Sequence, residues 1–245
     1  MFEVKNMNVL VTGGTRGIGL AIAKGFKNAG ANVWIHGSKE ESTRQVADEN
    51  GFHCVYGNLT EVENVHKMME QISKSVDVLD VLINNAGCEI HGTVDGIGEK
   101  ELEDLFRVNL FSPAMFVKDS VELLKKSSYP SIINITSIHQ LVAYKNNSAY
   151  CMSKAALEMH TKVSALELAE HGIRVNSIAP GAILTDINAE IIAAMDFEEW
   201  IPLNRVGNVE EIVGPAIFLA SKAASYITGS TIFVDGGYKE NLLRY

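Results

Sequence analysis

A tyrosine and a lysine four residues apart, Tyr150 and Lys154, form the pair in this sequence that could do acid/base chemistry. Apolar residues recur at helical spacing from 149 to about 170, and on a helix such neighbours share one face. A free phenol has a pKa near ~10, which an adjacent fixed cation lowers by stabilising the phenolate. The pair therefore predicts a tyrosine that gives or takes a proton near neutral pH. The same spacing is common on solvated helix faces, so other motifs must decide between the two interpretations.

A glycine-rich turn at 12–19 follows directly on the apolar run 9–11, which is typical of a buried strand. A helical pattern then runs from Leu20 until Gly30 ends it. In a turn of this kind the free N–H groups and the positive helix end attract a pyrophosphate. The spacing is Gly-x-x-x-Gly-x-Gly and not the commoner Gly-x-Gly-x-x-Gly, so the motif alone leaves a purely steric role open. The predicted phosphate-binding residues are Gly13, Thr15, Arg16, Gly17, Ile18 and Gly19.

The tip of the second predicted strand, 32–36, would face the adenosine ribose of a bound dinucleotide. An acidic residue there would bind the ribose hydroxyls and repel a 2′-phosphate, but none is present at the tip. Ser38 and Lys39 follow instead, and their hydroxyl and ammonium groups could hold that phosphate together with Arg16. The sequence therefore favours NADP(H) over NAD(H), although the acidic pair at 40–41 keeps the preference modest.

Short apolar runs alternate with helical patterns along the chain, and no linker or low-complexity segment divides it. The alternation predicts one α/β domain over 1–245, a doubly wound Rossmann sheet of seven mainly parallel strands with helices on both faces. Ligands of such sheets bind at the carboxyl ends of the strands, where Asn58 and Leu59 would meet an adenine. The predicted strands are 9–11, 32–36, 52–56, 80–84, 131–137 and 173–179, and 231–237 is predicted as a last strand and turn.

The composition argues against several classes of protein. A net charge of −9 disfavours a nucleic acid or an anionic membrane as partner. The three cysteines are far apart and lack Cys/His ligand spacing, so neither a disulfide framework nor a metal site is expected. No segment has the ~18 apolar residues of a membrane span, and no leader pattern opens the chain. We expect a soluble, cytoplasmic protein.

Ser137 closes the predicted strand 131–137, and its hydroxyl could donate to a substrate carbonyl oxygen beside Tyr150. A serine nucleophile would need a Gly-x-Ser-x-Gly elbow or a His/Asp pair at recognisable spacing, and the sequence offers neither. Hydrolase chemistry is therefore disfavoured.

Four motifs together resemble the short-chain dehydrogenase/reductase family: the turn 12–19, the Asn-Asn-Ala-Gly segment at 84–87, Ser137, and Tyr150 with Lys154. The order and spacing of these motifs resemble the family's pattern over nearly the whole chain. The resemblance implies hydride transfer between a nicotinamide cofactor and an alcohol or ketone. It also implies further cofactor-binding residues, namely Asn85, Ala86, Gly87, Tyr150, Lys154, Pro180, Gly181, Ile183 and Thr185. Of these, Ile183 and Thr185 would bind the nicotinamide carboxamide.

The resemblance implies a catalytic role for four residues. Tyr150 would be the acid/base, Lys154 would lower its pKa and bind the nicotinamide ribose, and Ser137 would fix the substrate oxygen. Asn109 would lie at an irregularity of the helix predicted from 99 to about 126 and hold a water that relays protons to Lys154. An asparagine inside a helix can also face solvent or mark a kink.

The substrate stays open between two groups of the family. Ser137-Ile138-His139-Gln140 and the stretch 181–190 resemble glucose and related sugar dehydrogenases, in which a His two residues after the Ser lines the pocket. The stretch 201–207 resembles 3-oxoacyl-carrier-protein reductases nearly as well. A small alcohol or ketone, most simply a sugar or polyol, is slightly favoured. The loop 89–98 and a lid at about 186–203 should border it, and the expected substrate contacts are Ser137, His139, Tyr150 and Ile187.

The helix that carries Tyr150 and the long helix before it contain many small and apolar residues. They resemble in this the corresponding helices of the family, which pack between subunits. The resemblance therefore implies a homo-oligomer, a dimer or a tetramer, although burial within one core would give the same pattern. A non-catalytic nucleotide-binding regulator is a remote alternative, because such proteins usually lose the Tyr or the Lys and both are present.

Overall fold

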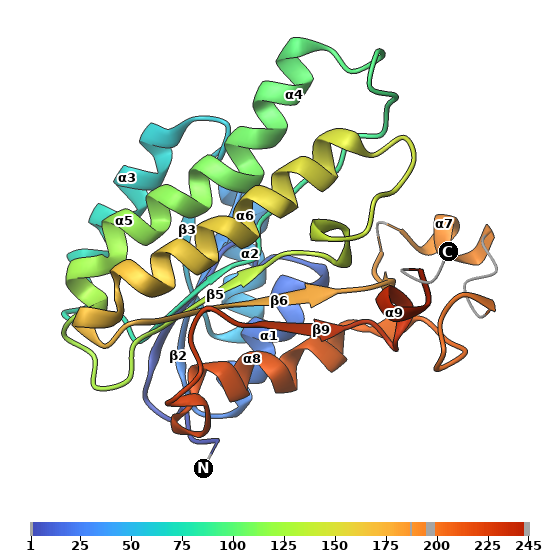
Figure 1. Ribbon diagram of the computed structural model, residues 1–245. Coiled ribbons are helices and arrows are strands. Elements are labelled where there is room, and N and C mark those ends of the chain that lie inside the picture. Colours follow the sequence, from blue (N-terminus) through green and yellow to red (C-terminus); the bar gives the residue numbers. More distant parts are fainter. Residues whose placement is uncertain (1, 187, 195–198, 243–245) are drawn as a thin grey trace.

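Seven strands form the large sheet of this computed structural model, which describes residues 2–186, 188–194 and 199–242 (Figure 1). They are β1 (Asn8–Val11), β2 (Asn32–Gly37), β3 (His53–Tyr56), β4 (Val81–Asn84), β5 (Ser131–Ile135), β6 (Arg174–Pro180) and β9 (Thr231–Val234). Their order is β3-β2-β1-β4-β5-β6-β9, and all six neighbouring pairs are parallel. The predicted doubly wound α/β fold is confirmed.

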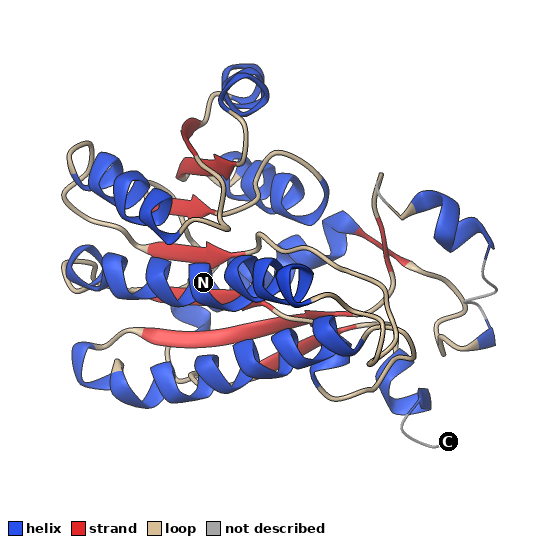
Figure 2. Ribbon diagram, turned by 90° about the horizontal axis from the view of Figure 1, so that it is seen from above, coloured by secondary structure: helices blue, strands red, loops and turns tan. Residues whose placement is uncertain are grey.

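Helices cover both faces of the sheet (Figures 1 and 2). One layer contains α1 (Gly17–Asn28), α2 (Glu40–Asn50) and α8 (Val213–Ala220), and the other contains α3 (Val62–Ser73), α5 (Ser112–Leu124) and α6 (Ser148–Glu167). Strand residues alternate between the layers, since Val9 and Val11 pack in the core on the α1 side and Leu10 packs on the α3 side. Short 3-10 turns follow α6, precede α8 and follow α8: η3 (Ala169–His171), η5 (Val209–Ile212) and η6 (Lys222–Ala224).

The strand order reverses between β1 and β4, which pair directly. In such sheets a ligand crevice forms where the order reverses, at the carboxyl ends of the strands. The glycine-rich turn 12–19 follows β1, the segment 84–87 begins at the end of β4, and Ser137 lies two residues beyond β5. The topology thus brings motifs that are far apart in the sequence to one edge of the sheet.

Short elements lie beyond this edge, with α7 and α9 at the right of Figure 1. They are the 3-10 turn η2 (Ile138–Gln140), the parallel pair β7 (Ile183–Leu184) and β8 (Gly207–Asn208), and the helices α7 (Ala189–Ala194) and α9 (Tyr238–Leu242). The helix α7 falls within the predicted lid, whereas Ile187 lies outside the described residues. No helix in the described part of the chain is long and apolar enough to cross a membrane.

The long helix predicted from 99 to about 126 is interrupted at its centre. A π-helical turn, η1 (Arg107–Phe111), joins α4 (Glu99–Phe106) to α5. Such turns insert an extra residue into a helix and often mark functional sites. Asn109 lies in this turn and is fully buried, so the helix irregularity implied at this residue is present.

Candidate active site

The turn after β1 is shaped to receive a phosphate group. Gly13 and Gly17 have φ values of 63° and 53°, a region that side-chain-bearing residues rarely adopt. A Cβ at Gly19 would lie 2.2 Å from the carbonyl oxygen of Gly13, so only glycine fits there. No side chain in the described structure caps the start of α1, and its first turn holds no acidic residue. The N–H groups and positive helix end are therefore open to an anion.

Asn85 holds this turn in place from the end of β4. Its side-chain Nδ2 donates to the carbonyl oxygens of Thr12 and Gly13, at 2.9 and 3.1 Å. The Thr12 hydroxyl in return accepts from the backbone N–H groups of Asn85 and Ala86, both at 3.0 Å. A cavity of about 150 Å³ opens in front of the turn, lined by Gly13, Arg16, Gly17, Ile18, Gly19, Asn85, Ala86, Thr185 and Asp186.

The residues predicted to bind the adenosine end surround the tip of β2. Ser38, Lys39, Arg16 and Asn58 are exposed, whereas Thr15 is half-buried, and a Cβ on Gly37 would lie 2.7 Å from the Thr15 methyl group. Leu59 differs from the expectation, because its side chain is buried in the core beneath α3 and α5. Any contact of this residue with an adenine must therefore come from its backbone.

Lys154 and Tyr150 lie one turn apart on α6, as predicted, and Tyr150 also lines a cavity. The ammonium nitrogen of Lys154 lies 5.6 Å from the centre of the Tyr150 ring and donates to the carbonyl oxygen of Ile135 at 2.9 Å. The lysine side chain is almost wholly buried, with 4% exposed. A carbonyl at the end of β5 thus fixes the position of the cation.

The electrostatics of the pair differ from the sequence-based expectation, in which Lys154 lowers the phenol pKa. In the protein alone the pKa of Tyr150 is raised, chiefly by burial and next by the carboxylate of Glu89, while its hydrogen bond with Ser137 acts in the opposite direction. Burial also lowers the pKa of Lys154, to about 8. Desolvation therefore dominates both shifts, because burial disfavours the charged form of each group.

Asn109 braces the segment that follows β4. Its Oδ1 accepts from the backbone N–H of Cys88 at 2.8 Å, and its Nδ2 donates to the Cys88 carbonyl oxygen at 2.9 Å and to the Ser153 hydroxyl at 3.0 Å. Gly87 lies between this amide and Lys154, since a Cβ there would be 3.4 Å from both side chains. Asn109 thus positions the backbone beside the lysine, and the water relay stays a prediction.

Ser137 caps the short turn η2 and does not belong to β5, which ends at Ile135. Its hydroxyl oxygen accepts from the backbone N–H of His139 at 3.2 Å, and it is hydrogen-bonded to Tyr150. The side chain is 6% exposed, so it meets the cavity but little bulk solvent. The structure brings Ser137, Tyr150 and Lys154 together as predicted.

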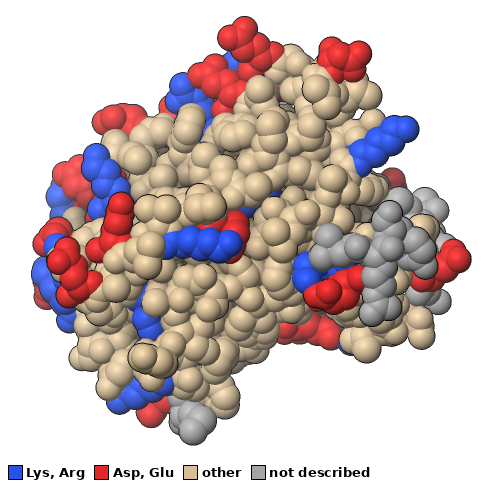
Figure 3. Space-filling view, in the orientation of Figure 1, with Lys and Arg blue, Asp and Glu red and all other residues tan. Residues whose placement is uncertain are grey.

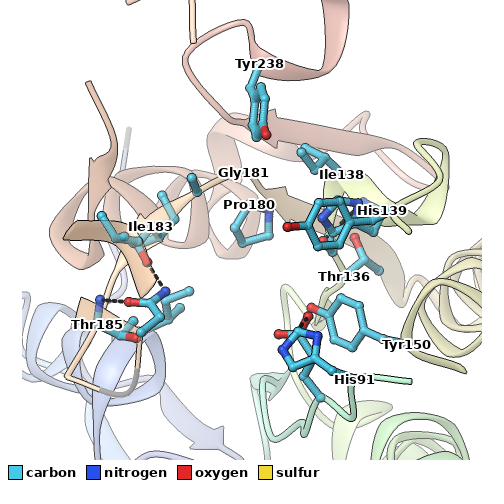
Figure 4. A pocket seen from close by; sticks show the side chains of 17 residues that line it. His91, Thr136, Ile138, His139, Tyr150, Pro180, Gly181, Ile183, Thr185 and Tyr238 are labelled. Carbon is cyan, nitrogen blue, oxygen red and sulfur yellow. Dashed lines mark hydrogen bonds and ion pairs between the residues drawn. The ribbon is translucent and has the colours of Figure 1, made fainter. Parts of the chain in front are cut away.

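A second cavity, of about 280 Å³, lies over Tyr150 and Ser137 (Figure 4). Figure 4 shows Tyr238, His139, Tyr150 and His91 around one side and Ile183 and Thr185 on the other. The full lining is Ile18, Glu89, His91, Thr136, Ser137, Ile138, His139, Tyr144, Tyr150, Pro180, Gly181, Ala182, Ile183, Thr185, Asn188, Ile192 and Tyr238. Ile18 and Thr185 line both cavities, so one elongated ligand can occupy the two together.

His139 lies at the cavity as predicted, and its Nδ1 is 3.0 Å from the carbonyl oxygen of Val142. Its ring stacks on Tyr144 with 5.1 Å between the centroids. Glu89, which the sequence did not single out, is held by a hydrogen bond from the Asn147 side chain, where α6 begins. The signal that could have found it was its place in the loop 89–98, directly after the Asn-Asn-Ala-Gly segment.

Asn188 is a further residue that the sequence did not single out. Its Oδ1 accepts from the backbone N–H of Thr185 at 2.7 Å, and its Nδ2 donates to the Ile183 carbonyl oxygen at 2.8 Å (dashed lines in Figure 4). These main-chain groups belong to the two residues expected to hold the nicotinamide carboxamide. An amide from the lid segment therefore satisfies them in the protein alone.

A glycine-walled cradle that adjoins a cavity with a tyrosine and a serine, with a buried lysine next to the tyrosine, is the site of a dinucleotide-dependent oxidoreductase. The chain belongs to the short-chain dehydrogenase/reductase family, since the family model described as enoyl-(acyl carrier protein) reductase matches residues 13–239.

Relatives of this chain are named as dehydrogenases and reductases. It is 37% identical over 236 residues to a 3-oxoacyl-[acyl-carrier-protein] reductase of Aquifex aeolicus, covering 93% of this chain and 95% of that one. It is 31% identical over 254 residues to the gluconate 5-dehydrogenase of Gluconobacter oxydans, covering 99% and 98%. The crystal structure of a Burkholderia cenocepacia gluconate 5-dehydrogenase in complex with NADP and tartrate matches with a TM-score of 0.90 and 32% identity, covering 98% and 97%. The protein is therefore an NAD(P)-dependent oxidoreductase of secondary alcohols and ketones, with a small-molecule substrate.

Proposed function

We propose that the protein interconverts a hydroxyl and a keto group on an uncharged sugar or polyol. The observation that carries this proposal is the set of polar groups in the wall of the substrate cavity. Hydroxyl, imidazole and carboxylate groups line it, including those of Glu89, His139, Tyr144 and Tyr238. A molecule with several hydroxyl groups can exchange hydrogen bonds with all of these side chains.

The charge of the cavity separates this substrate class from the acids named in some relatives. Among the described residues that line the cavity, none is a lysine or an arginine, and Glu89 is a carboxylate. A substrate carboxylate would therefore meet a like charge and find no guanidinium or ammonium partner there. This supports a neutral sugar over a sugar acid.

In this proposal Tyr150 transfers the hydroxyl proton, while Ser137 donates a hydrogen bond to the substrate oxygen. A bound nicotinamide supplies or accepts the hydride. Lys154, held by the Ile135 carbonyl, adds positive charge next to the phenol and would bind the ribose hydroxyls of a bound nicotinamide cofactor. Asn109 keeps the segment between them in place through Cys88.

We further propose that NADP(H) is preferred to NAD(H). The side chains of Arg16, Ser38 and Lys39 are exposed around the tip of β2, where a 2′-phosphate would lie. Comparing kcat/KM for NADPH and NADH tests the preference, and a value at least about tenfold higher for NADPH is expected from one charge-assisted contact. A higher value for NADH would refute it.

A second candidate activity is reduction of a 3-oxoacyl thioester. It is favoured by apolar side chains of the cavity wall, among them Ile18, Ile138, Ile183 and Ile192, which could pack along an acyl chain. The carrier-protein reductase among the relatives gives it further support.

A substrate panel followed by nicotinamide absorbance distinguishes these candidates. Glucose and neutral polyols are tested as alcohols, gluconate as an acid, and an acetoacetyl thioester and a steroid ketone as ketones. We expect the highest kcat/KM for a neutral sugar or polyol. A dominant thioester activity would establish the second candidate, and a dominant gluconate activity would refute the argument from charge.

We propose that the protein is a homo-oligomer joined through α6. Exposed apolar side chains recur along one face of this helix at Met152, Met159, Val163 and Leu166. Figure 3 shows wide uncharged areas on the face that carries α5 and α6, with many of the charged side chains near its margin. Light scattering after size-exclusion chromatography should give the molecular mass of at least a dimer, and Leu166→Lys should shift this mass toward that of the monomer. A monomeric wild type would refute this proposal.

A further inference from the structure

His36 occupies a position between the two loops that would hold the adenosine half of a cofactor. It lies near the end of β2, pairs with Val55 of β3, and its side chain is 3% exposed. The glycine-rich turn lies on one side of its ring, and Gly57, the residue before Asn58, lies on the other. Among the described residues, none of the proposed catalytic groups is hydrogen-bonded to the His36 ring.

Both nitrogens of the His36 ring are engaged with main-chain groups. The N–H of Gly13 donates to Nδ1 at 3.2 Å, and Nε2 lies 3.0 Å from the carbonyl oxygen of Gly57. A backbone N–H can only donate and a carbonyl can only accept, so the two contacts together require a neutral ring with its proton on Nε2. The main-chain oxygen of His36 also accepts from the N–H of Gly14, at 2.9 Å. One residue therefore fixes the start of the turn through both its side chain and its backbone.

We propose that His36 is a positioning residue that sets the spacing between the phosphate-binding turn and the adenine-side loop, and that protonation of its ring weakens cofactor binding. The inference rests on the proposed dinucleotide site. The ring has little room for adjustment, since His36 is buried and its ring centre lies 6.1 Å from that of Phe116 in α5. A shift of the ring must therefore move the loops that it joins.

The effect of protonation follows from the same two contacts. A proton on Nδ1 would replace an acceptor by a donor facing the N–H of Gly13, and that hydrogen bond would be lost. Burial lowers the pKa of His36, with the bond to Gly57 acting against this shift. The groups that face the ring from the turn, from the segment after β3 and from α5 are Gly13, Gly57 and Phe116, which carry no charge. Acid conditions should therefore separate the loops.

The experiment measures the Kd of NADP⁺ by titration calorimetry between pH 5 and 8, for wild type, His36→Gln and His53→Gln. His53 is an exposed histidine on the neighbouring strand and serves as the matched control. At pH 7.5 we expect His36→Gln to bind about tenfold more weakly, from the loss of a buried hydrogen bond. Between pH 7.5 and 5 wild type should lose more affinity than His36→Gln does. Titration of the 2′-phosphate is common to all three proteins and cancels in this comparison.

Steady-state kinetics give a readout that general destabilisation would not. His36→Gln should raise the KM for NADP⁺ while kcat at saturating cofactor stays within about twofold of wild type, because the residue contacts the phosphate-binding turn and the adenine-side loop and no catalytic group. Equal Kd values and equal pH dependence in His36→Gln and wild type would overturn the inference while leaving the dinucleotide site standing. Failure of wild type to bind NADP⁺ at pH 7.5 would overturn both.

If His36→Gln does not fold, nitrogen-15 NMR of the wild-type histidines decides the question. The His36 ring should show the Nε2–H tautomer, and saturating NADP⁺ should lower its pKa, since binding and protonation oppose one another. A ring protonated on Nδ1 at neutral pH, or a His36 pKa that the cofactor does not change, would refute the proposal.

Discussion

The phosphate-binding turn and the substrate cavity adjoin one another but are built in different ways. The turn is made of main chain, and its shape comes from Gly13, Gly17 and Gly19, braced by the amide of Asn85. The cavity is made of side chains that arrive from separate loops, such as Glu89, His139 and Tyr238. A main-chain site suits a ligand part that never varies, whereas a side-chain site can change with the substrate. Substitutions in the first should alter cofactor binding, and substitutions in the second should alter turnover and substrate choice.

The largest effect is expected for Tyr150→Phe in the cavity. Loss of the hydroxyl removes the proton donor and acceptor, so kcat should fall about a thousandfold or more. The Kd of NADPH should stay within about twofold, because the cradle is untouched. Stopped-flow turnover and fluorescence titration measure the two quantities, with the exposed Tyr226→Phe as control. Retained activity would disprove the assignment of the acid/base.

Lys154 lies where the two regions meet, and Lys154→Met should reduce both cofactor affinity and rate. It should also stabilise the cofactor-free protein. The pKa of Lys154 is about 8 when folded against 10.5 for an ordinary lysine. The unfolded chain therefore binds more protons between these values, and wild type loses stability as the pH falls from 10.5 to 8.

The difference in free energy of unfolding between Lys154→Met and wild type should shrink by roughly 3 kcal/mol as the pH rises from below 8 to above 10.5. Denaturant unfolding at a series of pH values checks this, with the exposed Lys118→Met as control. A difference that does not change with pH would show that the lysine keeps its ordinary pKa in the fold.

Gly19→Ala tests the main-chain region. The added Cβ would lie 2.2 Å from the Gly13 carbonyl oxygen and 2.4 Å from Asn85 Nδ2, so the turn must open. The KM for the cofactor should rise about a hundredfold while substrate preference is unchanged. Gly214→Ala in α8, whose Cβ would meet nothing within 4 Å, is the matched control and should be neutral. A change in substrate preference would contradict the division between the two regions.

The smallest effect is expected for Glu89→Gln, which removes the carboxylate from the cavity. The ratio of kcat/KM for gluconate to kcat/KM for glucose should rise about tenfold. This is the effect expected from removing one repulsion between like charges near a surface. The pKa of Tyr150 should fall, because the Glu89 charge is one of the causes that raise it. Competition assays and the alkaline limb of the pH–rate profile measure these changes. Glu99→Gln, at the exposed start of α4, controls for net charge.

The sequence predicted the main-chain region better than the cavity. The strands, the glycine-rich turn and the pairing of Tyr150 with Lys154 follow from local sequence patterns. Such patterns can be recognised in a single sequence. The pKa of Tyr150 could not be predicted in this way, because it depends on burial and on Glu89, which is 61 positions away in the chain. The burial of Leu59 and the contacts of His36 likewise depend on loops that meet only in the folded protein.

Asn188 has a consequence for how tightly the nicotinamide end of a cofactor is held. Its side chain is a primary carboxamide, the same functional group that nicotinamide carries, and it already bonds to Ile183 and Thr185. A ligand amide at these two residues must compete with a tethered amide, whose effective concentration is in the millimolar range or above. The exchange replaces two hydrogen bonds by two similar ones, so it adds little net affinity. Most of the affinity for a dinucleotide then has to come from its phosphate and adenosine end.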